Sequence, residues 1–223
     1  MSDPKSKIFY KNAGNPEVLK AVPEDSKFIL DIGCGAGDNA RLLSERGLII
    51  DGITFSETEA IEARRVCRTV YIHNLEYGLP ESIKPIYDVI ICSHVIEHIV
   101  NSENLIEQIK QIMIPKATCL IVAVPNFLVY KNRLRMLFGK FEYESAGLLD
   151  QTHVKWYTYK SIKNLLINSG FKIVNESVEG GVPFQSYLLF LNKKQKDLVK
   201  RILFKISKGF FGGEFIFVLS LNE

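Results

Sequence analysis

Short apolar runs alternate along this chain with longer segments in which apolar residues recur at helical spacing. The apolar runs predict strands at residues 27–32, 47–55, 69–73, 87–92, 117–124, 171–178 and 214–222. Helices are predicted after the Asn15-Pro16 pair, over 38–46, from Ser56, over 101–113 and over 158–168. Strands separated by helices imply right-handed crossovers. The pattern therefore predicts an α/β fold: one doubly wound, mostly parallel, seven-stranded sheet with helices on both faces.

Two long stretches, residues 126–157 and 180–213, stand outside this alternation. Compact domains rarely keep connections of this length without a functional reason. We therefore expect both stretches to be insertions that form a lid or a substrate region. A length of 223 residues leaves too little chain for a second core, so residues 1–223 are expected to form a single domain.

The composition excludes several classes of protein. With 47% hydrophobic and 24% charged residues, the chain does not belong to the disordered, collagen-like or coiled-coil classes. Its first residues lack the apolar stretch of a secretion signal, and no apolar run reaches the roughly 18 residues that a spanning helix needs. The four cysteines are widely spaced and form no C-x-x-C pair, which suits a reducing compartment. We expect a cytoplasmic protein.

The net charge of +3 is unevenly distributed. Residues 193–208 carry seven basic side chains and one acidic side chain, a local charge of +6, so the rest of the chain sums to −3. Residues 131–140 add four cations and no anion. These stretches favour an anionic acceptor, such as a small molecule bearing phosphate. Because the basicity is local, we do not expect nucleic acid as a partner.

The segment 193–208 also has apolar residues on one helical face, namely Leu198, Val199, Ile202, Leu203 and Ile206. A helix of this kind usually packs on its own domain. It could instead cover an anionic acceptor. A third use is contact with an acidic membrane surface through residues 193–211, with Phe204, Phe210 and Phe211 as anchors.

A glycine-rich turn, Asp31-Ile32-Gly33-Cys34-Gly35-Ala36-Gly37, follows the first predicted strand. Glycine allows positive φ and lets a ligand approach the backbone closely at the strand ends, where open sheets bind ligands. The spacing D-x-G-x-G-x-G differs from the G-x-G-x-x-G fingerprint of dinucleotide-binding proteins, which disfavours a nicotinamide-dependent oxidoreductase. The turn indicates a cofactor site, with a plain tight turn as the alternative.

The stretch FILDIGCGAGDNARLL resembles the first motif of the class I S-adenosylmethionine-dependent methyltransferases, and the likeness extends from about residue 8 to residue 178. The resemblance implies the strand order 3-2-1-4-5-7-6 with the last strand antiparallel. It implies S-adenosyl-L-methionine as cofactor and S-adenosyl-L-homocysteine as product. It also implies that the turn formed by Gly33, Cys34, Gly35 and Gly37 faces the methionine part of the cofactor, with Asp31 orienting its amino group.

Two further segments are expected to hold the nucleoside part of the cofactor. The family usually has an acidic residue at the end of the second strand, where this chain has Thr54. GITFSETE is similar to the GxTxSxxQ stretch of the cyclopropane fatty acid synthases, with Glu59 in place of the glutamine. Glu59 either accepts the ribose hydroxyls or only closes a capping box with Ser56. Asn74 and Leu75 match positions that contact adenine in the family; the alternative is that Asn74 bonds its own backbone.

The stretch Ser93-His94-Val95-Ile96-Glu97-His98 follows the fourth predicted strand. H-x-x-E-H is also a zinc-peptidase motif, but its position at a strand end, without a peptidase scaffold, disfavours that interpretation. The stretch resembles the SEVLEH-type segment of ubiquinone-biosynthesis O-methyltransferases. This implies cofactor or acceptor contacts by Ser93, His94 and His98. Helical spacing would place His94, Glu97 and His98 on one face, where a divalent ion is an alternative; we predict no metal.

The stretch DQTHVKWYT, residues 150–158, resembles the D-x-T-H-x-R-x-F-T signature of a branch of small-molecule methyltransferases linked to cell-envelope sugars and secondary products. An imidazole there, His153, has a pKa suited to removing a proton from a hydroxyl. The alternative is a structural histidine that pins the insertion to the core.

Together these features predict a methyltransferase that acts on an oxygen or nitrogen of a small-molecule acceptor, with His153 or His98 as the base. A non-catalytic module that binds the same cofactor is one alternative. A lipid-modifying enzyme like the cyclopropane synthases is another.

Overall fold

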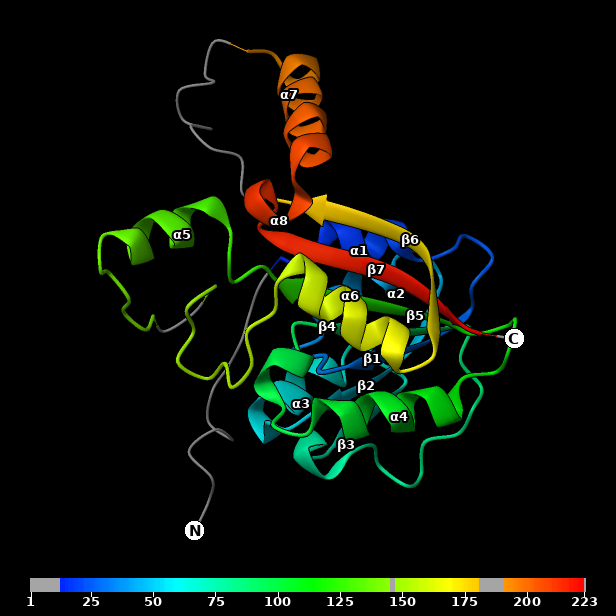
Figure 1. Cartoon of the computed structure of the whole chain (residues 1–223). Helices are drawn as coiled ribbons and strands as arrows, with labels where there is room; N and C mark the ends of the chain where they lie inside the picture. The colour runs from blue at the N-terminus through cyan, green and yellow to red at the C-terminus, as the bar shows by residue number, and fades with distance from the viewer. Residues whose placement is uncertain (1–12, 145–146, 181–190, 223) are drawn as a thin grey trace.

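Seven strands form one sheet in the order β3-β2-β1-β4-β5-β7-β6 (Figure 1). The computed structural model describes residues 13–144, 147–180 and 191–222. The strands are β1 (Phe28–Ile32), β2 (Ile49–Thr54), β3 (Thr69–Ile72), β4 (Val89–Ser93), β5 (Cys119–Pro125), β6 (Phe171–Glu179) and β7 (Glu214–Leu221). Strands β1 to β5 pair in parallel, and β7 is antiparallel to both β5 and β6. The predicted fold class, strand order and antiparallel last strand are confirmed.

Several helices begin at a residue whose side chain caps the free amides. Asn15 accepts hydrogen bonds from the amides of Glu17 and Val18 at the start of the first helix. Thr158 and Ser161 form a capping box before the sixth. The helices are α1 (Pro16–Ala21), α2 (Asp38–Ser44), α3 (Glu57–Ala63), α4 (Ser102–Ile112), α5 (Tyr130–Leu137), α6 (Tyr159–Asn168), α7 (Lys193–Ile206) and α8 (Lys208–Phe211). Two single 3₁₀ turns, η2 (Leu75–Tyr77) and η3 (Ile96–His98), follow β3 and β4.

The central strands are buried on both faces, as their continuous apolar runs predict. In β1, Ile29 belongs to a core cluster that includes side chains of α1, α2 and α3, whereas its neighbour Leu30 belongs to a second cluster that includes side chains of α4 and α6. Successive side chains of a strand point to opposite faces, so two layers of helices enclose the sheet. Removing one such buried side chain by substitution with alanine typically costs about 2–5 kcal/mol.

The segments that contain the predicted site residues meet at one edge of the sheet. The carboxyl ends of β1, β2, β4 and β5 meet there because these strands are parallel. Strand β7 runs the opposite way, so its first residue, Glu214, lies at the same edge and pairs in register with Pro125 at the end of β5.

The two long stretches contain helices of their own. Residues 126–157 include α5, which the sequence analysis did not predict, and their last part returns to the sheet, where the amides of Val154 and Lys155 donate to the Glu97 carbonyl. Helix α7 projects away from the sheet (Figure 1), and none of its residues is buried. Leu198, Ile202 and Ile206 are 55%, 50% and 69% exposed. The interpretation of this segment as a helix packed on its own domain is therefore wrong.

Among the described residues, no helix combines the length and the apolar character needed to cross a membrane.

Candidate functional site

A cavity of about 870 Å³ opens at the edge where the strand ends meet. Its wall comes from segments that are far apart in the chain: the α1 start, the glycine turn, the ends of β2, β4, β5 and β6, the η2 turn, the loop around residues 147–153 and the start of β7. A cavity of this size can enclose a cofactor together with part of a second small molecule. Parts of both predicted insertions line the cavity, namely residues between 147 and 153 and Gly213.

The glycine turn forms one wall of the cavity through Gly33, Cys34 and Gly35. Gly33 has a φ of 74°, and a Cβ there would lie 2.4 Å from Val95 Cγ2. Only glycine fits this turn, which brings its backbone to the cavity surface. Gly37 is not part of the cavity wall; a Cβ on it would lie 2.9 Å from Val66 Cγ2, so its absence of a side chain serves the packing of α2 against α3.

Asp31 lies behind the glycine turn rather than on the cavity surface. Its side chain is 2% exposed, and Oδ2 has no hydrogen-bond partner among the described residues. Burial raises the pKa of Asp31 to about 7. A buried oxygen without a partner is costly, and an amino group reaching past the turn would supply the missing donor.

Thr54 and Glu59 face each other at the cavity wall and are both buried. Thr54 Oγ1 donates to Glu59 Oε2 at 2.7 Å. The Ser56 hydroxyl caps α3 by accepting from the Glu59 amide. The Glu59 carboxylate therefore lies where it can accept hydroxyl donors from a ligand, whereas Ser56 serves the helix end.

Asn74 and Leu75 also line the cavity, at the η2 turn. Asn74 Oδ1 accepts from the Glu76 amide at 3.0 Å, so the local backbone bond that the sequence analysis considered is formed. The residue caps η2 and borders the cavity at the same time.

Ser93 and His94 leave β4 at the cavity, where His94 adopts a φ of 55°, which is unusual for a residue other than glycine. This turn carries the imidazole toward β7: Nε2 lies 2.8 Å from Glu214 Oε1, and Nδ1 lies 3.3 Å from Glu97 Oε1. Although burial opposes the charged form, the hydrogen bonds and negative charges of Glu214 and Glu97 raise the pKa of His94 to about 10. His94 is thus a cation at neutral pH.

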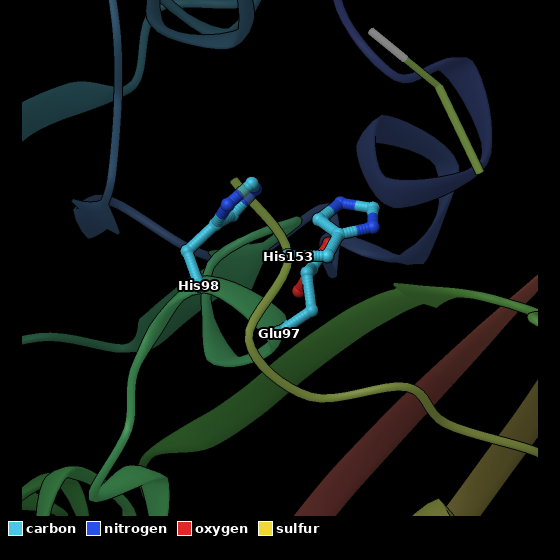
Figure 2. Close-up of side chains that lie close together, drawn as sticks. All are labelled: Glu97, His98 and His153. Atoms are coloured by element: carbon cyan, nitrogen blue, oxygen red, sulfur yellow. The ribbon is translucent and has the colours of Figure 1, made fainter. Parts of the chain in front are cut away.

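The expectation that His94, Glu97 and His98 share one helical face is wrong. The segment forms the 3₁₀ turn η3, whose three residues per turn do not align positions i and i+4. Instead, His153 joins Glu97 and His98 (Figure 2). One potential ligand atom of each residue lies within 4.8 Å of the others, and the two imidazole rings are 4.7 Å apart.

This cluster combines a deeply buried carboxylate with two imidazoles that border the cavity. Glu97 is 1% exposed, and its oxygens have no hydrogen-bond partner of good geometry in the described parts of the chain. Burial lowers the pKa of His153, so its imidazole is neutral at pH 7. His98 Nδ1 lies 3.1 Å from the Thr152 hydroxyl. The set can accept and stabilise a proton, and two imidazoles with a carboxylate are also a donor set that transition metals accept.

The cationic stretches lie outside the cavity. Its wall, as far as the chain is described, contains no lysine or arginine. In α5, Arg135 pairs with Glu144 at 2.8 Å, and the Arg133 guanidinium lies over the Phe210 ring at 5.5 Å.

Asn15, Glu179 and Glu214 are among the cavity-wall residues that the sequence analysis missed. Asn15 caps α1 and also donates from Nδ2 to Glu214 Oε1 at 2.6 Å. The two glutamates could have been found from the predicted strand order, because the end of β6 and the start of β7 must lie at the same edge as the end of β5.

Comparison with protein families gives a match over most of the chain. The family model described as a methyltransferase domain matches residues 5–176. A curated relative, the ubiquinone biosynthesis O-methyltransferase of Acinetobacter baumannii (strain AYE), is 26% identical over 95 residues. That match covers 40% of this chain and 40% of the relative, so the chain spans well under half the length of this protein.

Solved structures share the fold. An S-adenosylmethionine-dependent methyltransferase from Mesorhizobium loti superimposes with a TM-score of 0.62 at 18% identity, covering 92% of this chain and 96% of that one. The magnesium protoporphyrin IX methyltransferase of Synechocystis, which was solved with bound S-adenosylhomocysteine, gives 0.55 at 16% identity, covering 89% and 75%.

The cavity fits the cofactor that these proteins share: a glycine turn that a Cβ would obstruct, a buried hydroxyl-accepting carboxylate at Glu59, and an unpartnered buried oxygen at Asp31. The chain belongs to the methyltransferase domain family.

Proposed function

We propose that this enzyme methylates an oxygen or nitrogen of a small-molecule acceptor, with His153 as the general base. The observation that carries the proposal is a neutral imidazole on the cavity wall with a buried carboxylate, Glu97, behind it. The likeness to ubiquinone biosynthesis O-methyltransferases, although limited to 95 residues, supports an acceptor of low molecular mass.

The cofactor supplies a methyl group already activated on a sulfonium. The main task of the protein is therefore alignment and exclusion of water, which in oriented systems are worth roughly 7–11 kcal/mol. Gly33 and Gly35 let the backbone approach the methionine part, and Asp31 lies behind them to meet its amino group. Glu59, already accepting from Thr54, takes the ribose hydroxyls with its remaining lone pairs.

The proton of an acceptor hydroxyl goes to His153 as the oxygen takes the methyl group. The low pKa of His153 keeps it free to accept that proton. Once protonated, the imidazolium gains from the Glu97 charge, which raises its pKa. His98, held near the Thr152 hydroxyl, limits the position of the His153 ring beside it. An amine that enters neutral needs no such transfer before attack.

We further propose that α7 contacts an acidic membrane surface. Its apolar face, formed by Leu198, Ile202 and Ile206, is exposed, and residues 193–208 carry a net charge of +6. An amphipathic helix with cations on its polar face suits the boundary between lipid headgroups and acyl chains.

The methyl transfer is tested by measuring S-adenosylhomocysteine release from the purified protein with a panel of hydroxyl and amine acceptors. With a productive acceptor, we expect the rate to rise with pH as His153 loses its proton, at a pKa below 6.5, and to stay level above it. A protein that binds S-adenosylhomocysteine but never turns over any acceptor would instead be a binding module.

A further inference from the structure

The described wall of the cavity is rich in carboxylates. Seven acidic residues line it, and its basic side chains are imidazoles: the carboxylates are Glu17, Asp38, Glu59, Glu76, Asp150, Glu179 and Glu214, and the imidazoles are His94, His98 and His153. Lysine and arginine are absent from this wall over the residues that the structure describes. The basic stretches of the chain therefore contribute no side chain to the described wall.

Two of these glutamates face each other across neighbouring strands. Glu179, the last residue of β6, and Glu214, the first residue of β7, are directly opposed in the antiparallel register. Like charges in directly opposed positions destabilise a sheet. Lys200 reaches Glu179 from α7 at 2.8 Å, whereas Glu214 is met by Asn15 and His94. A carboxylate pair thus stands at the cavity edge beside the predicted acceptor region.

The charges at the end of the cavity around Glu179 and Glu214 do not balance. The His94 imidazolium is shared between Glu214 and Glu97. Among the described residues, the donors to the Asp150 carboxylate are neutral groups of Thr152, its amide and its hydroxyl. Four carboxylates, those of Glu97, Asp150, Glu179 and Glu214, therefore meet two cations, His94 and Lys200, which leaves a net charge of −2.

A second observation points to the same missing group. The Glu97 carboxylate is almost completely buried; His94 Nδ1 lies 3.3 Å from Oε1, but neither oxygen accepts a hydrogen bond of good geometry from a described residue. Buried carboxylates normally accept hydrogen bonds, so a further donor beside Glu97 would complete this end of the cavity.

We propose that the acceptor carries a protonated amine and binds it at this acidic end, beside the opposed Glu179 and Glu214. The inference rests on the proposed function, because it assigns the acceptor to the cavity where transfer would occur. An ammonium group has three donors and can bridge two carboxylates. A phosphate would meet a net negative charge with no lysine or arginine on the described wall to neutralise it. The geometry thus favours an amine or amino sugar over the phosphate-bearing acceptor that the basic stretches predicted.

The test uses three fragments of similar size, namely phenethylamine, phenethyl alcohol and phenyl phosphate. Each is titrated into protein saturated with S-adenosylhomocysteine, at low and high salt, and binding is followed by NMR. We expect the amine to bind at least about tenfold more tightly than the alcohol, the phosphate to bind most weakly, and salt to reduce the difference. Glu179→Gln and Glu214→Gln should each reduce the amine preference about three- to tenfold. Glu144→Gln, which removes an exposed carboxylate paired with Arg135, serves as the matched control and should change nothing.

Saturation with S-adenosylhomocysteine separates this inference from the proposed function. A protein that fails to bind S-adenosylhomocysteine at all refutes the proposed function. If S-adenosylhomocysteine binds normally, four results would overturn the amine proposal alone. These are a preference for the phosphate, equal binding of the three fragments, no binding of the amine, or an amine preference that neither glutamine variant changes.

Discussion

The two ends of the cavity are built in different ways. The cofactor end uses residues close together in the sequence, from Asp31 to Leu75, carried by consecutive β-α units. The proposed acceptor end combines His98, His153, Glu179 and Glu214, from four segments spread between residues 98 and 214. Local motifs therefore define the first end, whereas strand order and loop return define the second.

The two ends also differ in their surroundings. The cofactor end lies against buried strands, and its polar residues Thr54 and Glu59 are themselves buried. The acceptor end is bordered by the stretches that contain α5 and α7, which extend away from the sheet (Figure 1). The comparison teaches that binding of the cofactor can be altered by changes within one turn, whereas selection of the acceptor depends on contacts between distant segments.

The largest expected effect lies at the acceptor end. His153→Ala should lower kcat by about 10²–10⁴-fold on a hydroxyl acceptor, because it removes the base, while the affinity for S-adenosylhomocysteine stays the same. Steady-state release of S-adenosylhomocysteine and calorimetric titration measure the two quantities. Val154→Ala, a change at the exposed neighbouring residue, should leave both unchanged. An unaltered kcat in His153→Ala would assign the histidine a structural role only.

At the cofactor end, Gly33→Ala should weaken binding of S-adenosylhomocysteine about 10- to 100-fold. The added Cβ would lie 2.4 Å from Val95 Cγ2 at a positive φ, so the turn must move. Gly47→Ala is the matched control, because Gly47 also has a positive φ, but a Cβ there has nothing within 4 Å. Calorimetry on both variants separates obstruction of the cavity from backbone strain. An equal loss of affinity for S-adenosylhomocysteine in the two variants would contradict the role of Gly33 in the cavity wall.

Asp31→Asn should separate stability from binding. Because the pKa of Asp31 is raised to about 7 in the fold, its contribution to stability is present below about pH 4 and lost as the pH rises through 7. At pH 8 the asparagine variant should melt about 2–4 °C higher without ligand, yet bind S-adenosylhomocysteine about tenfold more weakly.

Asp51→Asn provides the opposite control for that variant. Although burial opposes ionisation, hydrogen bonds from Arg68 and Tyr87 lower the pKa of Asp51. Its contribution to stability is therefore present above pH 4 and lost as the pH falls through its lowered pKa. We expect this variant to melt lower at pH 8 and to keep its affinity for S-adenosylhomocysteine. The same direction of change in the two variants would show that the Asp31 carboxylate has a partner in solution.

The smallest effect is expected on the outer surface. The double change Leu198→Glu with Ile202→Glu should reduce binding to anionic phosphatidylserine vesicles about fivefold, because α7 loses apolar contact and positive charge. Affinity for S-adenosylhomocysteine should not change. Ile61→Glu, at an exposed apolar residue of α3, is the control in vesicle co-sedimentation. If the vesicles do not retain the native chain either, α7 has another partner.

The sequence predicted most of the cofactor end because its signals are local. The glycine spacing, the Asn15 and Ser56 caps and the apolar runs each depend on residues within one turn or strand. It failed at His94, where the chain bends through a positive φ toward Glu214, a residue 120 positions away. It also left the use of the 193–208 helix open among three possibilities, since an apolar stripe alone does not show whether a surface is available to cover it.

The succession of strands and helices and the position of the cofactor turn follow from the sequence alone, because backbone hydrogen bonding and hydrophobic alternation act over short distances. The order of the strands in the sheet was implied by the resemblance to the class I methyltransferases. Only the tertiary structure decided which histidine joins Glu97 and what charge the acceptor end carries. Both depend on side chains brought together by strand β7 and by the loop around His153, and such long-range pairings leave no periodic pattern in the chain.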